Sequence, residues 1–111
     1  MKVVFVNSDR IGEGDDALGA KLLGSFLYSL ARTERRPDAV VFMNGGVRLA
    51  CEGSPALDDI RLLEADGVRI YSCGTCLDWL HLAERLAVGE VGNMNDTAAL
   101  MMDADDVVSV G

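Results

Sequence analysis

The sequence contains few cysteines, a single histidine and no long hydrophobic run. Three cysteines in 111 residues exclude a disulfide scaffold, and an odd number cannot all pair within one chain. We therefore expect reduced thiols and a cytoplasmic protein. A structural zinc site needs about four ligands, whereas the chain offers one closely spaced cysteine pair, the distant Cys51 and His81. We expect neither a bound metal nor a cofactor.

Basic side chains are also scarce. Ten lysines and arginines stand against eighteen aspartates and glutamates, which gives a formal net charge of −8. This balance disfavours nucleic acids and anionic membrane surfaces as partners, because both present phosphate groups. No apolar run approaches the roughly 18 residues of a membrane span. The N-terminal residues MKVVFVNSDR lack the long apolar segment and the cleavage site of a secretion signal.

The segment RIGEGDDALG matches a phosphate-binding glycine loop only in part. Gly12 and Gly14 fit the first two glycines of the GxGxxG pattern, but Ala17 stands at the third position. Asp15 and Asp16 would repel a phosphate, and they suit the N-terminus of a helix instead. Nucleotide binding is therefore disfavoured.

Short β-branched runs alternate with longer helical patterns, which indicates an α/β fold with a mainly parallel sheet. We predict one domain over residues 1–111, with helices covering both faces of the sheet. Met94, Met101 and Met102 are expected to fill the core. The predicted strands are 2–6, 38–43, 68–72 and 106–110, with a short strand or loop at 87–92. The first predicted helix starts near Asp15, and the others cover residues 54–67, 75–86 and 95–104. In the second helix Ser54 is the predicted N-cap and Pro55 the first helical residue. Residues 44–53 are predicted as a loop.

The strongest chemical candidate is the motif Cys73-Gly74-Thr75-Cys76, directly after the third predicted strand. Thr75 is the predicted N-cap of the next helix, with Cys73 just before it and Cys76 in its first turn. The free amides and the dipole of a helix N-terminus stabilise a thiolate. We therefore predict that Cys73 is a nucleophile and Cys76 an optional partner. The alternative is that both are small side chains that fit a tight turn.

A CxxC motif in a βαβ setting is also typical of thioredoxin-like dithiols. Here the inner pair Gly-Thr lacks a proline, and the motif follows the third predicted strand, so this hypothesis is weaker. His81 lies five residues after Cys76, which is off the helical face defined by spacings of three and four residues. We interpret His81 as a structural residue at or near the surface.

Small and polar residues follow several of the predicted strands. The carboxyl ends of parallel strands share one edge of a sheet, where ligands usually bind. Turn chemistry alone would also favour asparagine, serine and glycine at these positions, so both interpretations stay open. The candidate binding residues are Asn7, Ser8, Asn44, Gly45, Gly74, Thr75 and Asn93.

Four segments carry a resemblance to a known family and cover nearly the whole chain. They are VNSDRIGEGDDALGAKLLGSFLYSL, NGGVRL, EGSPALDDIRLLEADGVRIYSCGTCLDWL and LAVGEVGNM. They resemble the C-terminal domain of YedF-type selenium-metabolism proteins, within the DsrE-like sulfurtransferase superfamily. The resemblance implies a three-layer α/β/α DsrE-like fold with a five-stranded parallel sheet, and a homo-oligomer. It also implies that Cys73 carries sulfur as a persulfide.

The chain departs from that family in two ways. YedF-type proteins commonly carry an N-terminal TusA-like sulfur-carrier domain, whereas this chain starts directly at the DsrE-like part, so we expect a separate TusA-like partner. Cys51 stands where an aliphatic residue is expected, so we interpret it as a packing residue. The resulting hypothesis is a sulfurtransferase-like protein that accepts sulfur or selenium on Cys73, with Cys76 resolving the adduct. The competing hypotheses are a non-catalytic subunit that binds a sulfur carrier, and a dithiol redox protein.

Overall fold

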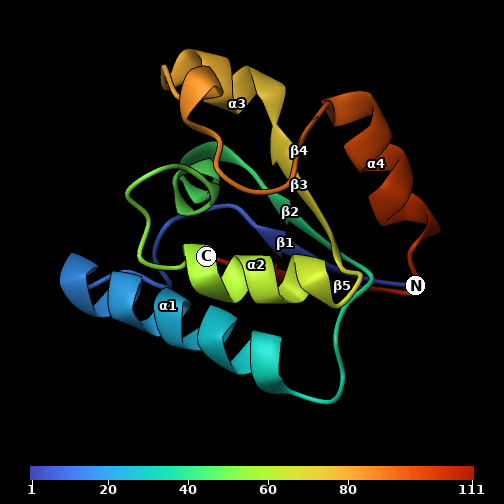
Figure 1. The fold of residues 1–111 in the computed structure, drawn as a ribbon, viewed down its shortest axis with the longest axis horizontal. Helices are drawn as coiled ribbons and strands as arrows, with labels where there is room; N and C mark the ends of the chain where they lie inside the picture. Colours follow the sequence, from blue (N-terminus) through green and yellow to red (C-terminus); the bar gives the residue numbers. More distant parts are fainter.

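The computed structural model describes residues 1–111 and contains five strands, four α-helices and two short 3-10 helices (Figure 1). The strands are β1 Lys2–Val6, β2 Ala39–Phe42, β3 Arg69–Cys73, β4 Glu90–Gly92 and β5 Asp106–Val110. The helices are α1 Asp16–Arg32, α2 Leu57–Ala65, α3 Gly74–Trp79 and α4 Met94–Asp103, with the 3-10 helices η1 Asn44–Ala50 and η2 Ala83–Arg85. None of the helices is both long and apolar enough to cross a membrane.

All five strands are parallel and lie in the order β4-β3-β2-β1-β5. The predicted α/β fold with a five-stranded parallel sheet is therefore confirmed. From β1 to β4 the chain adds strands in one direction, and it then returns to place β5 beside β1. Because crossovers between parallel strands are right-handed, α1, α2 and α3 lie on one face of the sheet and α4 lies on the other (Figure 1).

The two faces of the sheet are covered unequally. Nineteen buried residues form the core beneath α1 and α2, whereas only Val3, Ala39 and Val41 form a buried cluster on the α4 side. Met101 packs against this smaller cluster. Met94 and Met102 are 57% and 84% exposed, so the prediction that all three methionines fill the core was wrong. The reason is that α4 covers this face of the sheet alone, so only the side of α4 that faces the sheet is buried.

The start of α1 confirms a sequence prediction. Asp15 is the N-cap, and its carboxylate accepts a hydrogen bond from the N–H of Leu18 at 2.9 Å. The acidic pair of the glycine-rich segment therefore serves the helix N-terminus, as its charge indicated. The segment 87–92, predicted as a short strand or a loop, contains a strand, β4.

Two other boundaries differ from prediction. α2 begins at Leu57 because the Ser54 hydroxyl accepts the N–H of Ala56 at 3.1 Å, which makes a turn instead of a helix cap. Pro55 therefore lies before the helix. Residues 44–50, which were predicted as a loop, form the 3-10 helix η1.

α3 is shorter than the predicted helix over residues 75–86. It ends at Trp79, and His81 adopts a left-handed conformation with φ of 58°. The N–H of Leu82 then bonds back to the carbonyl of Leu77 at 2.7 Å, which closes the helix end. His81 is exposed, as the sequence predicted.

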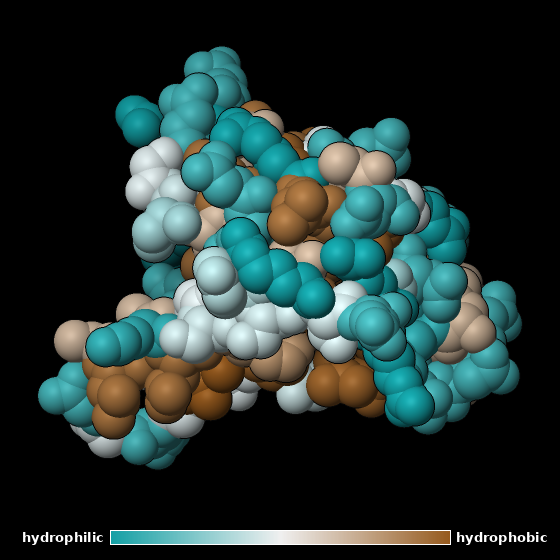
Figure 2. All heavy atoms as spheres, turned by 60° about the horizontal axis from the view of Figure 1, so that its bottom comes forward, coloured by the Kyte–Doolittle hydropathy of each residue, from teal (hydrophilic) through white to brown (hydrophobic).

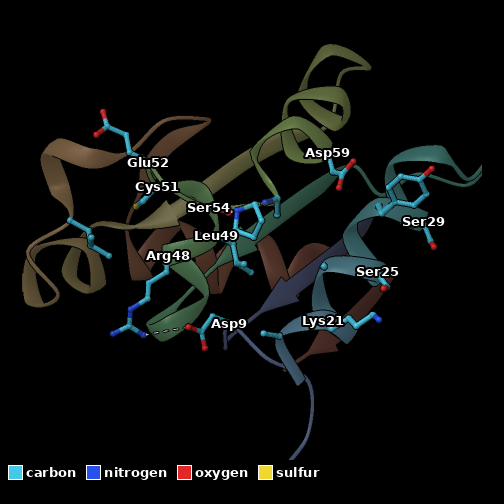
Figure 3. Close-up of a pocket in the computed structure, with 17 residues that line it drawn as sticks. Asp9, Lys21, Ser25, Ser29, Arg48, Leu49, Cys51, Glu52, Ser54 and Asp59 are labelled. Atoms are coloured by element: carbon cyan, nitrogen blue, oxygen red, sulfur yellow. Dashed lines mark hydrogen bonds and ion pairs between the residues drawn. The ribbon is translucent and has the colours of Figure 1, made fainter. Parts of the chain in front are cut away.

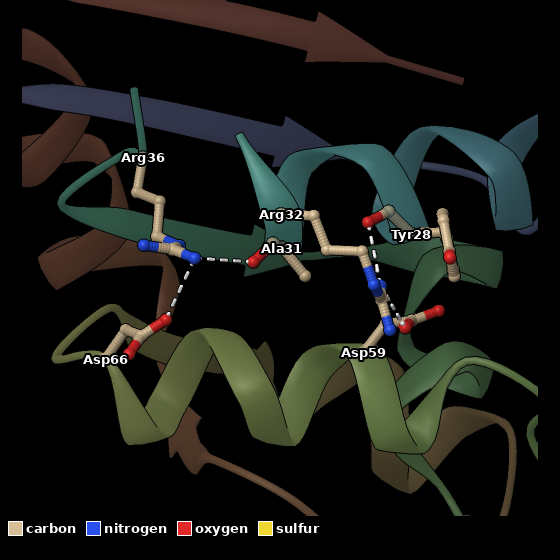
Figure 4. Close-up of polar contacts among 6 residues, drawn as sticks. All are labelled: Tyr28, Ala31, Arg32, Arg36, Asp59 and Asp66. Atoms are coloured by element: carbon tan, nitrogen blue, oxygen red, sulfur yellow. Dashed lines mark hydrogen bonds and ion pairs between the residues drawn. The ribbon is translucent and has the colours of Figure 1, made fainter. Parts of the chain in front are cut away.

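Two arginines of the α1 region tie it to α2 (Figure 4). Arg32 contacts Asp59 at 2.8 Å and lies 3.6 Å above the centre of the Tyr28 ring. Arg36 contacts Asp66 at 3.1 Å. Ion pairs that water reaches contribute at most about 1 kcal/mol each. They therefore orient the two helices, while the buried apolar residues supply most of the stability.

Gly46 marks the tightest approach of η1 to the sheet. A Cβ atom on Gly46 would lie 2.3 Å from the carbonyl oxygen of Val6, far inside van der Waals contact. At the neighbouring Gly45, a Cβ would meet the flexible guanidinium of Arg48 at 3.2 Å. Glycine at position 46 therefore allows η1 to lie directly against the end of β1.

We expect Gly46→Ala to lower the free energy of unfolding by about 2–3 kcal/mol, because backbone atoms have to move apart. Gly45→Ala is the matched control, and we expect a loss below about 1 kcal/mol because the Arg48 side chain can swing away. Urea denaturation of both variants measures the difference. Equal losses would show that η1 is not pressed against β1.

Candidate functional site

The CGTC motif forms the turn between β3 and α3. Cys73 is the last residue of β3 and also the N-cap of α3, so the strand passes into the helix without a loop. The prediction that Thr75 is the N-cap was therefore wrong. Glycine at position 74 leaves room for β4, because a Cβ there would lie 3.0 Å from a Val91 methyl group and 3.2 Å from the Gly92 carbonyl oxygen.

Cys76 is held by the end of the neighbouring strand. The backbone N–H of Asn44 donates a hydrogen bond to the Cys76 sulfur at 3.1 Å. Asn44 adopts a left-handed conformation with φ of 51°, which asparagine tolerates better than most residues. An N–H at this position stabilises negative charge on sulfur.

The Cys76 thiol also borders a small cavity of about 250 Å³, lined by Asn44, Thr75, Cys76, Trp79 and Leu80. Trp79 is 81% exposed at its rim. Trp79 and Leu80 follow Cys76 by three and four positions, which is the spacing that places side chains together on a helix. Sequence reasoning missed both residues, although this spacing was available to find them.

Cys73, the predicted nucleophile, is the more buried of the two cysteines, and Cys76, the predicted optional partner, is the more exposed. Cys73 is only 4% exposed, whereas Cys76 is half-buried and borders the cavity. All three cysteines are free thiols. The solvent-facing sulfur of the motif is therefore Cys76, and Cys73 lies beneath the surface beside it.

Burial raises the pKa of the Cys76 thiol above its ordinary value. The Asn44 N–H lowers the pKa in part, because it favours the thiolate, and the adjacent Cys73 side chain raises it again. Cys76 is consequently a thiol at neutral pH in the resting protein. The Cys73 side chain therefore lies close to the Cys76 sulfur.

Ser72 adds an unusual polar group next to the motif. Its hydroxyl is buried, with 1% of the residue exposed, and it has no hydrogen-bond partner. A buried hydroxyl without a partner costs free energy. Sequence reasoning could not find this cost, because Ser72 has the pattern of any small residue at a strand end.

The other predicted binding residues differ in their distance from the cysteines. Asn93 directly follows Gly92, which pairs with Cys73 across β3 and β4, whereas Asn7 and Ser8 lie two strands away. Asn7 and Ser8 follow β1, which β2 separates from β3, and the Ser8 hydroxyl accepts the N–H of Arg10 at 3.1 Å. Asn93 caps α4, where its side chain accepts the N–H of Asp96 at 2.8 Å. Of the predicted set, the structure brings Asn44 and Thr75 to the Cys76 cavity, while Gly45 lies near Arg48.

A larger cavity, of about 890 Å³, lies elsewhere (Figure 3). It separates α1 from η1 and the segment before α2, with Lys21 and Ser25 on one side and Arg48 and Ser54 on the other. Cys51 lines it but is 1% exposed and donates to the carbonyl of Val47 at 3.2 Å, as expected of a packing residue. No group of three or more His, Cys, Asp or Glu side chains is arranged to hold a metal ion.

The structure is that of an α/β protein with a parallel sheet and two thiols at the carboxyl edge of that sheet. Over residues 1–110 the chain matches the DsrE/DsrF-like family, and it belongs to that family. This family is associated with sulfur relay. No curated protein gives a significant match to the chain.

Solved structures share the fold at low sequence identity. The YchN protein from E. coli is 19% identical with a TM-score of 0.73, and the alignment covers 97% of each chain. MTH1491 from Methanobacterium thermoautotrophicum, a protein of unknown function, is 22% identical with a TM-score of 0.70, and the alignment again covers 97% of each chain. These likenesses establish the DsrE-like fold.

We expect the alkylation rate of Cys76 by iodoacetamide to keep rising above pH of about 8.5, the ordinary midpoint of a free thiol. Alkylation requires the thiolate, so a raised pKa moves the midpoint upward. In Cys73→Ser one cause of the raised pKa is gone, and the midpoint should move down. Peptide mass spectrometry resolves the site. A midpoint below the ordinary value, or one that Cys73→Ser leaves in place, would contradict this account.

Asn44 offers a test of the strained backbone. Asn44→Gly keeps the N–H and favours positive φ, so we expect stability and the Cys76 midpoint to change little. Asn44→Ala keeps the N–H but lacks asparagine's tolerance of this conformation, and we expect it to lose about 1 kcal/mol of stability. Urea denaturation compares the two. If alanine proved as stable as glycine here, the left-handed conformation of residue 44 would be in doubt.

Proposed function

We propose that the protein carries sulfur or selenium, receiving the atom at Cys76 and holding it as a persulfide on Cys73. The observation that supports this most directly is the Asn44 N–H directed at Cys76, a half-buried thiol at a cavity and next to a second thiol. Membership of a family associated with sulfur relay supports the same chemistry. The motifs CGTCLD and LAVGEVGNM support assignment to the YedF-type group.

The proposed transfer needs no net oxidation. Cys76 first loses its proton to solvent, and its thiolate attacks the outer sulfur of a donor persulfide. The sulfur–sulfur bond of the donor breaks, and the donor leaves as a thiolate. Cys76 now carries the persulfide, whose terminal anion the cavity and the Asn44 amide accommodate.

The second step moves the atom within the motif. The Cys73 sulfur gives up its proton and attacks the outer sulfur of the Cys76 persulfide. A new sulfur–sulfur bond forms to Cys73, the bond to the Cys76 sulfur breaks, and Cys76 leaves with that proton as a thiol. The buried position of Cys73 then shields the persulfide from solvent reductants. Delivery reverses these steps toward an acceptor thiol.

The proposal places donor and acceptor on other proteins, including a separate TusA-like carrier. In this view residues 1–111 act as one DsrE-like domain in a homo-oligomer. The three free thiols suit a reducing compartment such as the cytoplasm. The acidic surface that accompanies a net charge of −8 favours a carrier with a basic face.

A second candidate function rests on the closeness of the Cys73 and Cys76 side chains. Adjacent thiols are also the requirement for a dithiol redox protein, in which Cys73 and Cys76 form a disulfide. The two functions differ in what the oxidised protein contains. A carrier gains an atom, whereas a dithiol protein loses two hydrogens.

The test incubates reduced protein with a low-molecular-weight persulfide and measures the intact mass. We expect wild type to gain one sulfur atom, located on Cys73 by fragmentation of the tryptic peptide 70–85. Cys73→Ser should load on Cys76 but lose the atom on brief exposure to a low-molecular-weight thiol, because the buried holding thiol is absent. Cys76→Ser should load about tenfold more slowly or worse, because the entry thiol is absent. Cys51→Ser is the matched control and should load like wild type.

Each other outcome has a defined meaning. An adduct kept in Cys73→Ser but absent from Cys76→Ser would assign storage to Cys76 and overturn the relay order. No adduct in any variant would favour a subunit that only binds a sulfur carrier. A reversible two-electron couple between Cys73 and Cys76 without any adduct would favour the dithiol protein.

A further inference from the structure

β5 is an edge strand with a free side. The N–H of Asp106 bonds to the carbonyl of Met1, and the carbonyl of Val110 accepts the N–H of Asn7 at 3.2 Å. Backbone groups alternate in direction along a strand. The groups of residues 106, 108 and 110 therefore face β1, and those of Val107 and Ser109 face away from the sheet.

This edge has few of the features that usually protect edge strands, and its only charged side chain is Asp106 at its first position. It has no lysine, proline or bulge within its five residues, and three of the five are valines. Val107 and Val108 are 40% and 42% exposed, one on each face of the sheet. The other edge strand, β4, has only three residues and ends in a glycine. An unprotected apolar edge is a template for pairing with another strand.

The neighbouring helix adds apolar surface. α2 packs against α1, and Leu18 and Leu22 of α1 do not line the large cavity between α1 and η1. These leucines are 54% and 45% exposed. Figure 2 shows hydrophobic side chains gathered over the N-terminal end of α1, at the lower left of the view. α1 connects β1 to β2, and β5 lies on the other side of β1.

We propose that β5 pairs antiparallel with β5 of a second copy, about a two-fold axis at Val108. In this register Val107 lies opposite Ser109 of the second copy, and both have outward backbone groups. Each such pair exchanges two hydrogen bonds, so the free N–H and C=O groups of both edges are satisfied. The five strands of each copy then continue into one sheet of twice that width.

The charges of the edge suit this register. The chain carries a net charge of −8, so two copies repel each other at long range. Antiparallel pairing about Val108 places Asp106 opposite Val110 of the second copy, and the two Asp106 side chains lie at opposite ends of the paired strands. A parallel arrangement would instead bring like carboxylates side by side. Salt screens the remaining repulsion, so the dimer should tighten as ionic strength rises.

A cysteine crosslink tests the register. In a Cys73→Ser/Cys76→Ser background, Val108→Cys should form a disulfide dimer under a mild oxidant, because residue 108 faces itself in a non-hydrogen-bonded pair with Cα atoms about 4.5 Å apart. Val107→Cys is the matched control and should stay uncrosslinked, since it faces Ser109. The double variant Val107→Cys/Ser109→Cys should crosslink again. Crosslinking of Val107→Cys as readily as Val108→Cys would overturn the two-fold at Val108.

A second measurement uses the protein without added cysteines. Sedimentation velocity should give twice the 11.9 kDa chain mass, or an even multiple of it. Ser109→Pro removes an outward N–H that no intramolecular bond uses, so it should keep the fold, by circular dichroism, and weaken association at least tenfold. Ser109→Ala should associate like wild type. A wild type that stays monomeric at high protein and salt concentration, or a Ser109→Pro variant that associates normally, would overturn the proposal.

Discussion

The parallel pairing of β2 with β3 is the interaction on which the site depends. In this register Phe42 lies opposite Ser72, so the residues that follow the two strands emerge at the same level of the sheet. One strand continues into Asn44 and η1, and the other into Cys73 and α3. The N–H of the first segment thereby reaches Cys76 in the second. A shift by one residue would turn alternate side chains to the other face and separate the amide from the sulfur.

Much of this arrangement could be predicted because it follows from local patterns. The apolar runs identified four of the strands, and the acidic pair at the start of α1 identified its cap. What the patterns missed depends on contacts between distant segments. η1 exists because Gly46 fits against Val6, and no local preference of residues 44–50 reveals that contact. Ser54 and Thr75 have the chemistry of N-caps, yet a local turn and the direct passage of β3 into α3 determine where those helices begin.

The unequal cover of the sheet follows from the order of its strands. Three crossovers in one direction place three helices on one face, and the single return to β5 leaves α4 alone on the other. The exposed methionines of α4 and the exposed valines of β5 both follow from this order of the strands. Sequence periodicity marks such residues as apolar, but only the topology shows that too few elements are present to cover them.

The resting state of Cys76 fits a thiol that reacts only with a docked donor. A raised pKa leaves little thiolate at neutral pH, which slows reaction with freely diffusing oxidants. The thiolate that does form is intrinsically more nucleophilic, because nucleophilicity rises with basicity. A partner that covers the cavity holds its sulfur next to the Cys76 sulfur, so the reaction no longer depends on chance collisions between the two. Trp79, 81% exposed at the rim of that cavity, gives such a partner an aromatic surface to bury. Selectivity then resides in docking, and the chemistry needs no permanently activated thiol.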